Sequence, residues 1–405
     1  MTVLDLADHL RPGDTVLIGQ AVAEPPRLVE RLIALAPRVP GLTALCGYTL
    51  SNGWDAVQPG TLDVKGFIAH GGLRKLAARG LLDVLPWHLS SFQTYLESGS
   101  VVVDVVLLQV GPADADGFHN LGATADYVMA AVERARVVLV EVNPHMPRTR
   151  SSYRLHRSRV TASFEVDSDL AASPARPATE IEEVVARHVA DLVPSGACLQ
   201  IGLGPLADAV CRNLRGRRGL QVRAGVAGDW LVDLYEAGAM SSEEPSSWVS
   251  MALGSRRLYD FLDGSESVEF APTHDLVDPF EVRRGGPLFA INSAIEVDLT
   301  GQVNSEIVAG RYVGGIGGQV DFLRATRASR DGLAVIAMAS THPTGESRIV
   351  AELSGPVTSL RSDIDVVVTE HGVADLRGAS LIQRSVRLAA VAAPQYREDL
   401  LAADH

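Results

Sequence analysis

The chain has 405 residues, of which 46% are hydrophobic and 21% are charged, and its formal net charge is -13 at pH 7. A chain of this length buries enough apolar surface to be stable without disulfides or a structural metal, and it predicts two domains. The negative net charge and the scattered basic residues argue against nucleic acid as the main partner.

The sequence predicts neither a membrane segment nor a secretory signal. Its most apolar stretch, residues 101–110, contains Asp104 and is far shorter than the ~20 residues that span a bilayer. The N-terminus, MTVLDLADHL, has acidic residues at once and no basic region followed by an apolar run. Cys46, Cys198 and Cys211 have no paired spacing, which argues against a disulfide framework or a zinc site. We therefore expect a cytoplasmic protein, most simply an enzyme.

Short apolar runs alternate with helical patterns along the chain. Nearly continuous apolar runs are typical of buried parallel strands, whereas apolar residues spaced three and four apart indicate amphipathic helices. This alternation predicts a doubly wound α/β fold with helices on both faces of the sheets. In chain order, we expect a helix at 26–35, a strand at 101–110, a helix at 124–134, a strand at 137–142, a helix at 180–192, a strand at 198–202, a helix at 206–214, and strands at 333–338 and 364–369.

The two halves of the chain have similar patterns. Residues 11–35 and 193–214 each contain a turn with Pro and Gly, a strand, a second Gly-bearing turn and an amphipathic helix. This similarity predicts a duplicated α/β domain with a cleft between the copies. The small, Pro-containing segment 171–179 is the expected junction, which gives domains at 1–175 and 176–405.

Two glycine-rich segments are candidates for ligand binding. The segment GLGPL at 202–206 follows a strand and opens a helix, where free N–H groups can meet phosphate or carbonyl oxygens. It lacks the third glycine of the dinucleotide fingerprint, and an ordinary strand-to-helix turn is the alternative. Residues 314–318 hold four glycines in five positions. A ligand pressed against the main chain would explain their entropic cost, and a surface loop is the alternative.

Charged side chains in apolar surroundings are candidate acids, bases or nucleophiles. The alternative is that such residues cap turns or pair with arginines such as Arg377. The 11 histidines show no metal-ligand spacing, and the sequence contains no GxSxG or Walker pattern. The candidates are Glu296, Asp298, Glu370, His371 and Asp375.

Several long motifs follow one another along the chain. In the first half they are PWHLS, VGPADADGFHNLG and ARVVLVEVNPHMPRT; in the second half they are SWVSMALGSRRLYDFLD, INSAIEVDLTGQVNSE, GGIGGQVDFLRAT and SDIDVVVTEHGVADLRGASL. Together they resemble the acetyl-CoA hydrolase/transferase family, and within it the 4-hydroxybutyrate CoA-transferases of family I. The resemblance covers nearly the whole chain. It implies two similar α/β domains with the active site between them, an acyl-CoA substrate, and a homodimer or higher homo-oligomer.

The resemblance also implies where coenzyme A makes contact. GLGPL matches the family's CoA-contacting loop, and a glycine pair in the later segment matches its second glycine-rich contact. The implied residues are Gly202, Leu203, Gly204, Pro205, Leu206, Gly317 and Gly318.

The family's catalytic glutamate has no counterpart in this sequence. In the family, this glutamate attacks the acyl-CoA thioester and becomes a glutamyl-CoA thioester. It lies in a segment resembling G-I-H-S-E-M-x-S-D-G, and both flanks of that segment align here without a gap. The glutamate position is then Gly225, the histidine position is Arg223, and Asp229 falls on the family's aspartate. Ala224, Gly228 and Trp230 also depart from the pattern.

Because glycine has no side chain, it forms no covalent intermediate, and three hypotheses follow. In the favoured hypothesis, a small-molecule acceptor or water enters beside Gly225 and attacks the thioester directly, so the enzyme is an acyltransferase or a hydrolase. Arg223, Asp229 or His371 then orients the attacking molecule or accepts its proton. In the second, a carboxylate such as Asp229 or Glu296 replaces the nucleophile and CoA transfer survives, although a nucleophile must be placed within a fraction of an ångström. In the third, the protein is a non-catalytic regulatory homologue that binds CoA.

Overall fold

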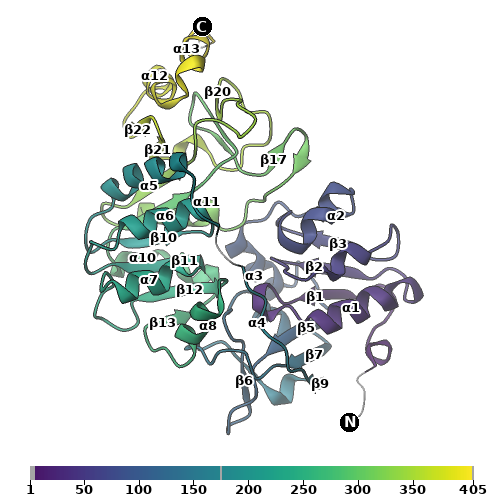
Figure 1. Cartoon of the computed structure of the whole chain (residues 1–405). Helices are drawn as coiled ribbons and strands as arrows, with labels where there is room; N and C mark the ends of the chain where they lie inside the picture. The colour runs from purple at the N-terminus through teal and green to yellow at the C-terminus, as the bar shows by residue number, and fades with distance from the viewer. Residues whose placement is uncertain (1–4, 174–175, 404–405) are drawn as a thin grey trace. The chain divides into compact units, whose positions relative to one another are not determined.

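The computed structural model describes residues 5–173 and 176–403 (Figure 1). These residues belong to two compact units, and each unit is formed from three stretches of the chain. The first unit comprises Met1–Ser173, Trp248–His274 and Arg311–Gly317, and the second comprises Pro174–Ser247, Asp275–Gly310 and Gly318–His405. Among the described residues, no helix combines the length and apolar character needed to cross a membrane.

The first unit is built on a seven-stranded sheet in the order β4-β3-β2-β1-β5-β7-β9, and all of its pairings are parallel. The strands of the sheet are β1 (Thr15–Ile18), β2 (Thr43–Cys46), β3 (Asp63–Gly66), β4 (Leu82–Val84), β5 (Val105–Val110), β7 (Val137–Val142) and β9 (Ala162–Glu165). Its helices are α1 (Pro26–Leu35), α2 (Arg74–Ala78), α3 (Leu89–Ser98), α4 (Val128–Val132) and α8 (Arg256–Leu262). Further elements are β6 (Phe118–Asn120), β8 (Arg154–His156), β12 (Ser247–Ala252), β13 (Val268–Phe270), α9 (Thr273–Leu276) and β18 (Arg311–Tyr312).

Apolar cores cover both faces of this sheet. Val16 and Ile18 of β1 point toward α1 and α2, whereas Leu17, between them, points toward α3 and α4. Successive side chains of a strand alternate between faces, so a strand buried on both sides is apolar throughout. The nearly continuous apolar runs of the sequence therefore identify the central strands of a sheet that is covered on both faces.

The second unit has a parallel sheet in the order β11-β10-β14-β19-β21, which the antiparallel strand β22 extends. The strands are β10 (Cys198–Ile201), β11 (Gln221–Ala227), β14 (Leu288–Asn292), β19 (Leu333–Ala337), β21 (Val366–Thr369) and β22 (Gly372–Asp375). A smaller sheet contains β15 (Glu296–Asp298), β16 (Val303–Asn304) and β20 (Ile349–Val350), and β17 covers Ile307–Val308. The helices are α5 (Glu180–Leu192), α6 (Pro205–Asn213), α7 (Trp230–Glu236), α10 (Pro279–Arg284), α11 (Gln319–Ala325), α12 (Leu381–Val391) and α13 (Arg397–Ala402).

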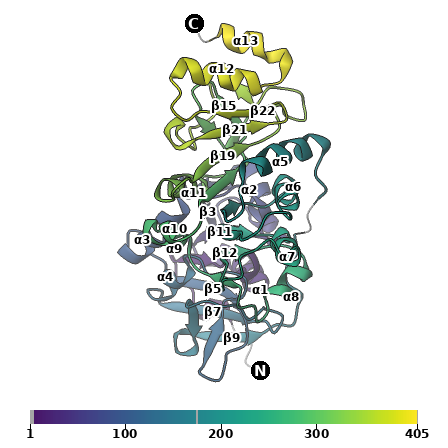
Figure 2. The ribbon, with the colours of Figure 1, turned by 90° about the vertical axis from the view of Figure 1, so that its left-hand side faces the viewer.

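Helices cover both faces of the second sheet. Figure 2 shows α5, α6 and α7 on one side of the strands and α10 and α11 on the other. Cys198 of β10 packs with Val282 of α10 and Ala325 of α11, which identifies the face that α10 and α11 cover. The two units together confirm the expected doubly wound α/β fold.

The predicted elements are right in their centres and less accurate at their ends. The strand at 137–142 and the helices at 26–35 and 180–192 have the predicted bounds. The strand predicted at 101–110 begins only at Val105. The residue before it, Asp104, accepts the Thr15 N–H with its carboxylate (2.9 Å) and is not part of the strand. The helix predicted at 124–134 begins only at Val128, whose N–H donates to the Asp126 carboxylate (3.0 Å).

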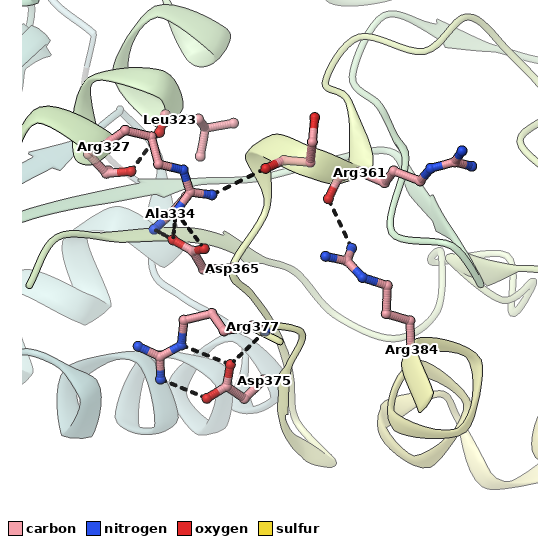
Figure 3. Close-up of polar contacts among 10 residues, drawn as sticks. Leu323, Arg327, Ala334, Arg361, Asp365, Asp375, Arg377 and Arg384 are labelled. Atoms are coloured by element: carbon pink, nitrogen blue, oxygen red, sulfur yellow. Dashed lines mark hydrogen bonds and ion pairs between the residues drawn. The ribbon is translucent and has the colours of Figure 1, made fainter. Parts of the chain in front are cut away.

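A buried carboxylate fixes the end of α11 to the second sheet (Figure 3). Asp365, just before β21, is 3% exposed and accepts the Ala334 N–H of β19 at 2.9 Å. It also accepts the Arg327 guanidinium at 2.8 Å, from the turn that follows α11. The nearby ion pair of Asp375 and Arg377 (2.7 Å) has two exposed side chains. It confirms the alternative in which Asp375 pairs with an arginine.

Replacing the buried carboxylate should cost far more stability than replacing the exposed one. In Asp365→Ala, the Ala334 N–H and the Arg327 guanidinium lose their acceptor, so we expect the free energy of unfolding to fall by about 2–3 kcal/mol. Asp375→Ala is the matched control and should change it by less than about 1 kcal/mol. Urea denaturation followed by circular dichroism measures both. Equal losses in the two variants would contradict this interpretation of Asp365.

Candidate functional site

Each sheet has a position where the strand order reverses, and open α/β sheets bind ligands beyond the carboxyl ends of the strands at such a position. In the first unit it lies between β1 and β5, and in the second between β10 and β14. The loops that leave these strands are therefore the first places to look for a site. The turn from β1 to α1 and the turn from β10 to α6 correspond to the two similar segments of the sequence.

Buried polar side chains of the first unit hold its turn in place. Glu24 accepts the Ser51 N–H (2.9 Å) and the Trp54 indole N–H (2.8 Å). Gln109 of β5 donates to the Val22 carbonyl at 2.7 Å. These bonds satisfy the Val22 carbonyl of the turn and the N–H groups that face Glu24.

The N-terminus of α1 is also satisfied from within the unit. Glu141 of β7 is 1% exposed and accepts the Leu28 N–H of the first turn of α1 at 2.7 Å. Burial raises the pKa of Glu141 to about 7, although the N–H groups of Leu28 and Arg27 lower it. A carboxyl group of the protein thus occupies the place where an anionic ligand would meet the helix dipole.

The corresponding turn of the second unit is open. Apart from adjacent residues, no heavy atom of the described part of the chain lies within 4 Å of where a Cβ on Gly202 or Gly204 would be. Gly204 has φ +114°, a conformation that favours glycine, and Pro205 begins α6 directly after it. Its N-cap residue is Gly204, which has no side chain to offer as a cap. The first N–H groups of a helix are a common binding place for a phosphate or carbonyl oxygen.

A pair of amides lies between the two strands at this point. The side-chain amide Nδ2 of Asn292 in β14 donates to the side-chain Oε1 of Gln200 in β10 at 2.8 Å. Gln200 is 5% exposed. Neither residue is among the predicted site residues, although a polar Gln inside the apolar strand 198–201 is a signal for Gln200. Their mutual bond holds the start of the open turn next to the end of β14.

Gly225 lies in β11, the neighbour of β10, and is half-buried. A Cβ placed on it would lie 3.4 Å from Cε2 of Phe322 in α11. Gly225 therefore lies on the face that α11 covers, and the absence of a side chain leaves space beside the Phe322 ring. The position that the family pattern assigns to a glutamate is thus next to β10 and contains only backbone.

Arg223 shares this face, because it is two residues from Gly225 on the same strand. It is 6% exposed, and its guanidinium donates to the Cys198 thiol. Burial raises the pKa of that thiol to about 11, although Arg223 lowers it. Cys198 begins β10, whereas the open turn follows the end of β10, so this contact draws Arg223 away from the turn.

Asp229 lies beside the open turn. It precedes Trp230, the first residue of α7, whose indole N–H donates to the Gly202 carbonyl at 3.2 Å. Burial and the neighbouring Asp229 carboxylate raise the pKa of Asp208 in α6 to about 6, against the effect of Arg212. Two carboxyl groups therefore lie near each other where α6 and α7 begin.

Glu296 and Asp298 are held by structural hydrogen bonds. Glu296 accepts from Asn304 Nδ2 (2.9 Å) and from the N–H (2.6 Å) and hydroxyl of Ser354. Asp298 accepts the Thr300 N–H (2.9 Å) and further donors of the same turn, which confirms its interpretation as a turn cap. The structure does not bring either residue into contact with the open turn.

His371 lies in the turn that follows β21. Its N–H donates to Thr369 Oγ1 (3.1 Å), and its Nε2 lies 3.6 Å from Glu370. Glu370 in turn accepts the Ser340 N–H and hydroxyl. β21 is three strands from β10, which corresponds to roughly 14 Å across the sheet. His371 is thus on the same edge of the sheet as the open turn but beyond direct reach of it.

The second glycine-rich segment is partly explained by packing in the first unit. A Cβ on Gly315 would lie 2.2 Å from the Phe67 carbonyl, so only glycine allows this approach. The Gly317 carbonyl accepts the Leu89 N–H at 3.0 Å, and its φ is +52°. Gly318 precedes α11 as its N-cap. Chain packing therefore accounts for Gly315, whereas Gly317 has open space around it.

The first unit also carries a cavity of about 1330 Å³. Its lining includes four arginines, and each lies within 4 Å of a carboxylate: Arg148 with Asp263, Arg150 with Glu266, Arg154 with Asp114, and Arg256 with Asp260. Because these charges are already paired, the lining gives no indication of an anionic ligand. The open turn of the second unit remains the better candidate.

The chain belongs to the acetyl-CoA hydrolase/transferase family. Residues 1–161 match the acetyl-CoA hydrolase/transferase N-terminal domain and residues 254–403 match the C-terminal domain. The 4-hydroxybutyrate coenzyme A transferase of Clostridium kluyveri is 30% identical over 95% of this chain and 92% of its own length. The succinyl-CoA:cyclohexane-1-carboxylate CoA transferase of Geobacter metallireducens is 31% identical over 98% of this chain and 93% of its own length.

A solved structure agrees with this assignment. The structure of RipA from Yersinia pestis matches with a TM-score of 0.90 and 30% identity, and the match covers 97% of this chain and 94% of that one. The expected family and the two-domain α/β fold are therefore confirmed.

The buried carboxyl at α1 predicts a pH-dependent stability. Above pH ~4.5 the unfolded chain ionises Glu141, whereas the native carboxyl stays protonated up to about 7. The native state is therefore destabilised as pH rises through this interval. Glu141→Gln removes the titration, so its stability relative to the wild type should improve by on the order of 2 kcal/mol between pH 5 and pH 8.

Denaturant titrations at both pH values measure this effect, and Glu133→Gln, an exposed position of the same unit, is the control. A stability difference between Glu141→Gln and the wild type that stays constant with pH would show that Glu141 does not titrate in this range.

Proposed function

We propose that this chain is an enzyme that acts on acyl-CoA thioesters and transfers the acyl group directly to a small-molecule acceptor or to water. The family and its named CoA-transferases support acyl-CoA chemistry. The finer proposal is that no glutamyl-CoA stage occurs. The observation that supports this finer proposal is Gly225. This residue without a side chain lies where the family pattern has its nucleophile, in the strand beside the open turn.

In this proposal, the turn at 202–206 receives the thioester end of coenzyme A. The geometry that supports it is the bare backbone at Gly202 and Gly204, directly before the first turn of α6. The first N–H groups of α6 would polarise the thioester carbonyl and stabilise the negative charge that develops on its oxygen. Such donors contribute about 3 kcal/mol in comparable sites. Gly317 and Gly318 are proposed as a second contact with coenzyme A.

The reaction itself exchanges one acyl bond for another. The nucleophilic oxygen or nitrogen of the acceptor attacks the thioester carbon, the bond from carbon to sulfur breaks, and coenzyme A leaves as its thiol. The proton that the acceptor loses is passed to the departing sulfur. Asp229 is the proposed carrier of this proton, because it is the predicted candidate that lies beside the open turn.

Two variants separate the binding step from the transfer step. Gly225→Leu fills the proposed entry of the acceptor, so we expect acyl transfer to fall about tenfold or more while the affinity for coenzyme A is kept. Gly204→Val forces a branched side chain into φ +114° at the turn, so coenzyme A binding should weaken about tenfold or more. Calorimetry measures binding, and mass spectrometry identifies products from a panel of acyl-CoAs with amines, alcohols, carboxylic acids or water.

Each alternative has its own result in this experiment. A new CoA thioester of an added carboxylic acid would support CoA transfer by a substitute carboxylate. Tight coenzyme A binding without turnover of any acyl-CoA would support a regulatory homologue. Full activity of Gly225→Leu would show that the acceptor does not enter beside this residue. Circular dichroism spectra of both variants should match that of the wild type.

A further inference from the structure

The residues at positions 228 and 230 differ in size from the family pattern in opposite directions. Where the family pattern has Ser-Asp-Gly, this chain has Gly228, Asp229 and Trp230. Trp230 is 2% exposed, and its indole donates to the Gly202 carbonyl at 3.2 Å. A position that carries no side chain in the family pattern thus supplies a large side chain that contacts the open turn.

The two changes depend on each other sterically. A Cβ on Gly228 would lie 3.1 Å from Trp230 Cδ1 and 2.9 Å from Leu203 Cδ2. Both separations are shorter than the optimal contact between carbon atoms, which is ~3.5–4.0 Å. A side chain at 228 therefore requires Leu203 Cδ2 to move and the indole of Trp230 to shift by a few tenths of an ångström. Gly228 provides the space through which the indole reaches the turn.

The indole bond determines how one peptide group is oriented. The carbonyl of Gly202 and the N–H of Leu203 belong to the same peptide plane, and in a trans peptide they point in opposite directions. Because the carbonyl is held toward the indole, the Leu203 N–H is directed to the opposite side. Gly202 precedes this peptide group and Gly204 follows one residue later, so without the bond the turn would have many accessible conformations.

We infer that Trp230 is a positioning residue that holds the Gly202–Gly204 turn in the conformation that receives coenzyme A. The identity of this ligand rests on the proposed function. Trp230 acts through the Gly202 carbonyl and takes no part in the bond exchange. A turn that is ordered before the ligand arrives loses less conformational entropy on binding, so the indole strengthens affinity.

Trp230→Phe tests the inference because it keeps a buried ring and removes the N–H donor. We expect the Kd for coenzyme A, measured by calorimetry, to rise roughly fivefold. Hydrogen exchange of the amides at 203–207, measured by mass spectrometry without ligand, should become faster. Trp87→Phe, in the aromatic cluster of the first unit, is the matched control and should leave both quantities unchanged.

A double-mutant cycle tests the steric dependence. Gly228→Ser should weaken coenzyme A binding in the wild type, because its side chain displaces the indole, and should have little further effect in Trp230→Gly. Unchanged Kd and exchange in Trp230→Phe, or equal effects of Gly228→Ser in both backgrounds, would overturn the inference. A wild type that does not bind coenzyme A would overturn the proposed function, whereas the exchange rates would still decide whether the indole holds the turn.

Discussion

The start of α6 is the constraint on which the site depends. Every α-helix begins with N–H groups that lack an acceptor within the helix, and a fold must supply one or leave them to a ligand. The first unit supplies Glu141 to α1. In the second unit, the N-cap residue of α6 is Gly204, and the glycines before the helix place no side chain over the backbone. Two similar α/β units thus differ at corresponding positions, and only the second has the features of a binding turn.

The departures from the family pattern around this turn are connected. Gly225 stands where the family pattern has its nucleophile, the Arg223 guanidinium donates to the Cys198 thiol, and Trp230 adds a hydrogen bond to the turn. A decaying site would lose its ligand contacts along with its nucleophile. In the proposed function, the change removes one step of the family chemistry, whereas the turn keeps its glycines and has a supporting contact from Trp230. This combination favours an active acyl-CoA enzyme with a shorter reaction sequence over a regulatory homologue.

The sequence predicted the features that depend on local pattern. Alternating apolar runs predicted the parallel sheets, and the spacing of glycines predicted the turn at 202–206. The bond between Gln200 and Asn292 was missed because it joins residues 92 positions apart, and strand register cannot be read from either segment alone. Trp230 was recognised as a departure, but its bond to Gly202 depends on the packing of α7 against the turn. Gly315 belongs to a segment for which the sequence left a ligand contact and a surface loop open, and the close approach of Phe67 explains this glycine instead.

The absence of a covalent intermediate is the central claim, and mass spectrometry of the intact protein tests it most directly. The protein is incubated with an acyl-CoA that it turns over, quenched within the turnover time, and measured with and without borohydride reduction. The account predicts the unmodified protein mass in both samples, because no carboxylate occupies position 225. An adduct that retains coenzyme A, with peptide mapping that locates a reduced carboxylate at Asp229 or Glu296, would contradict it.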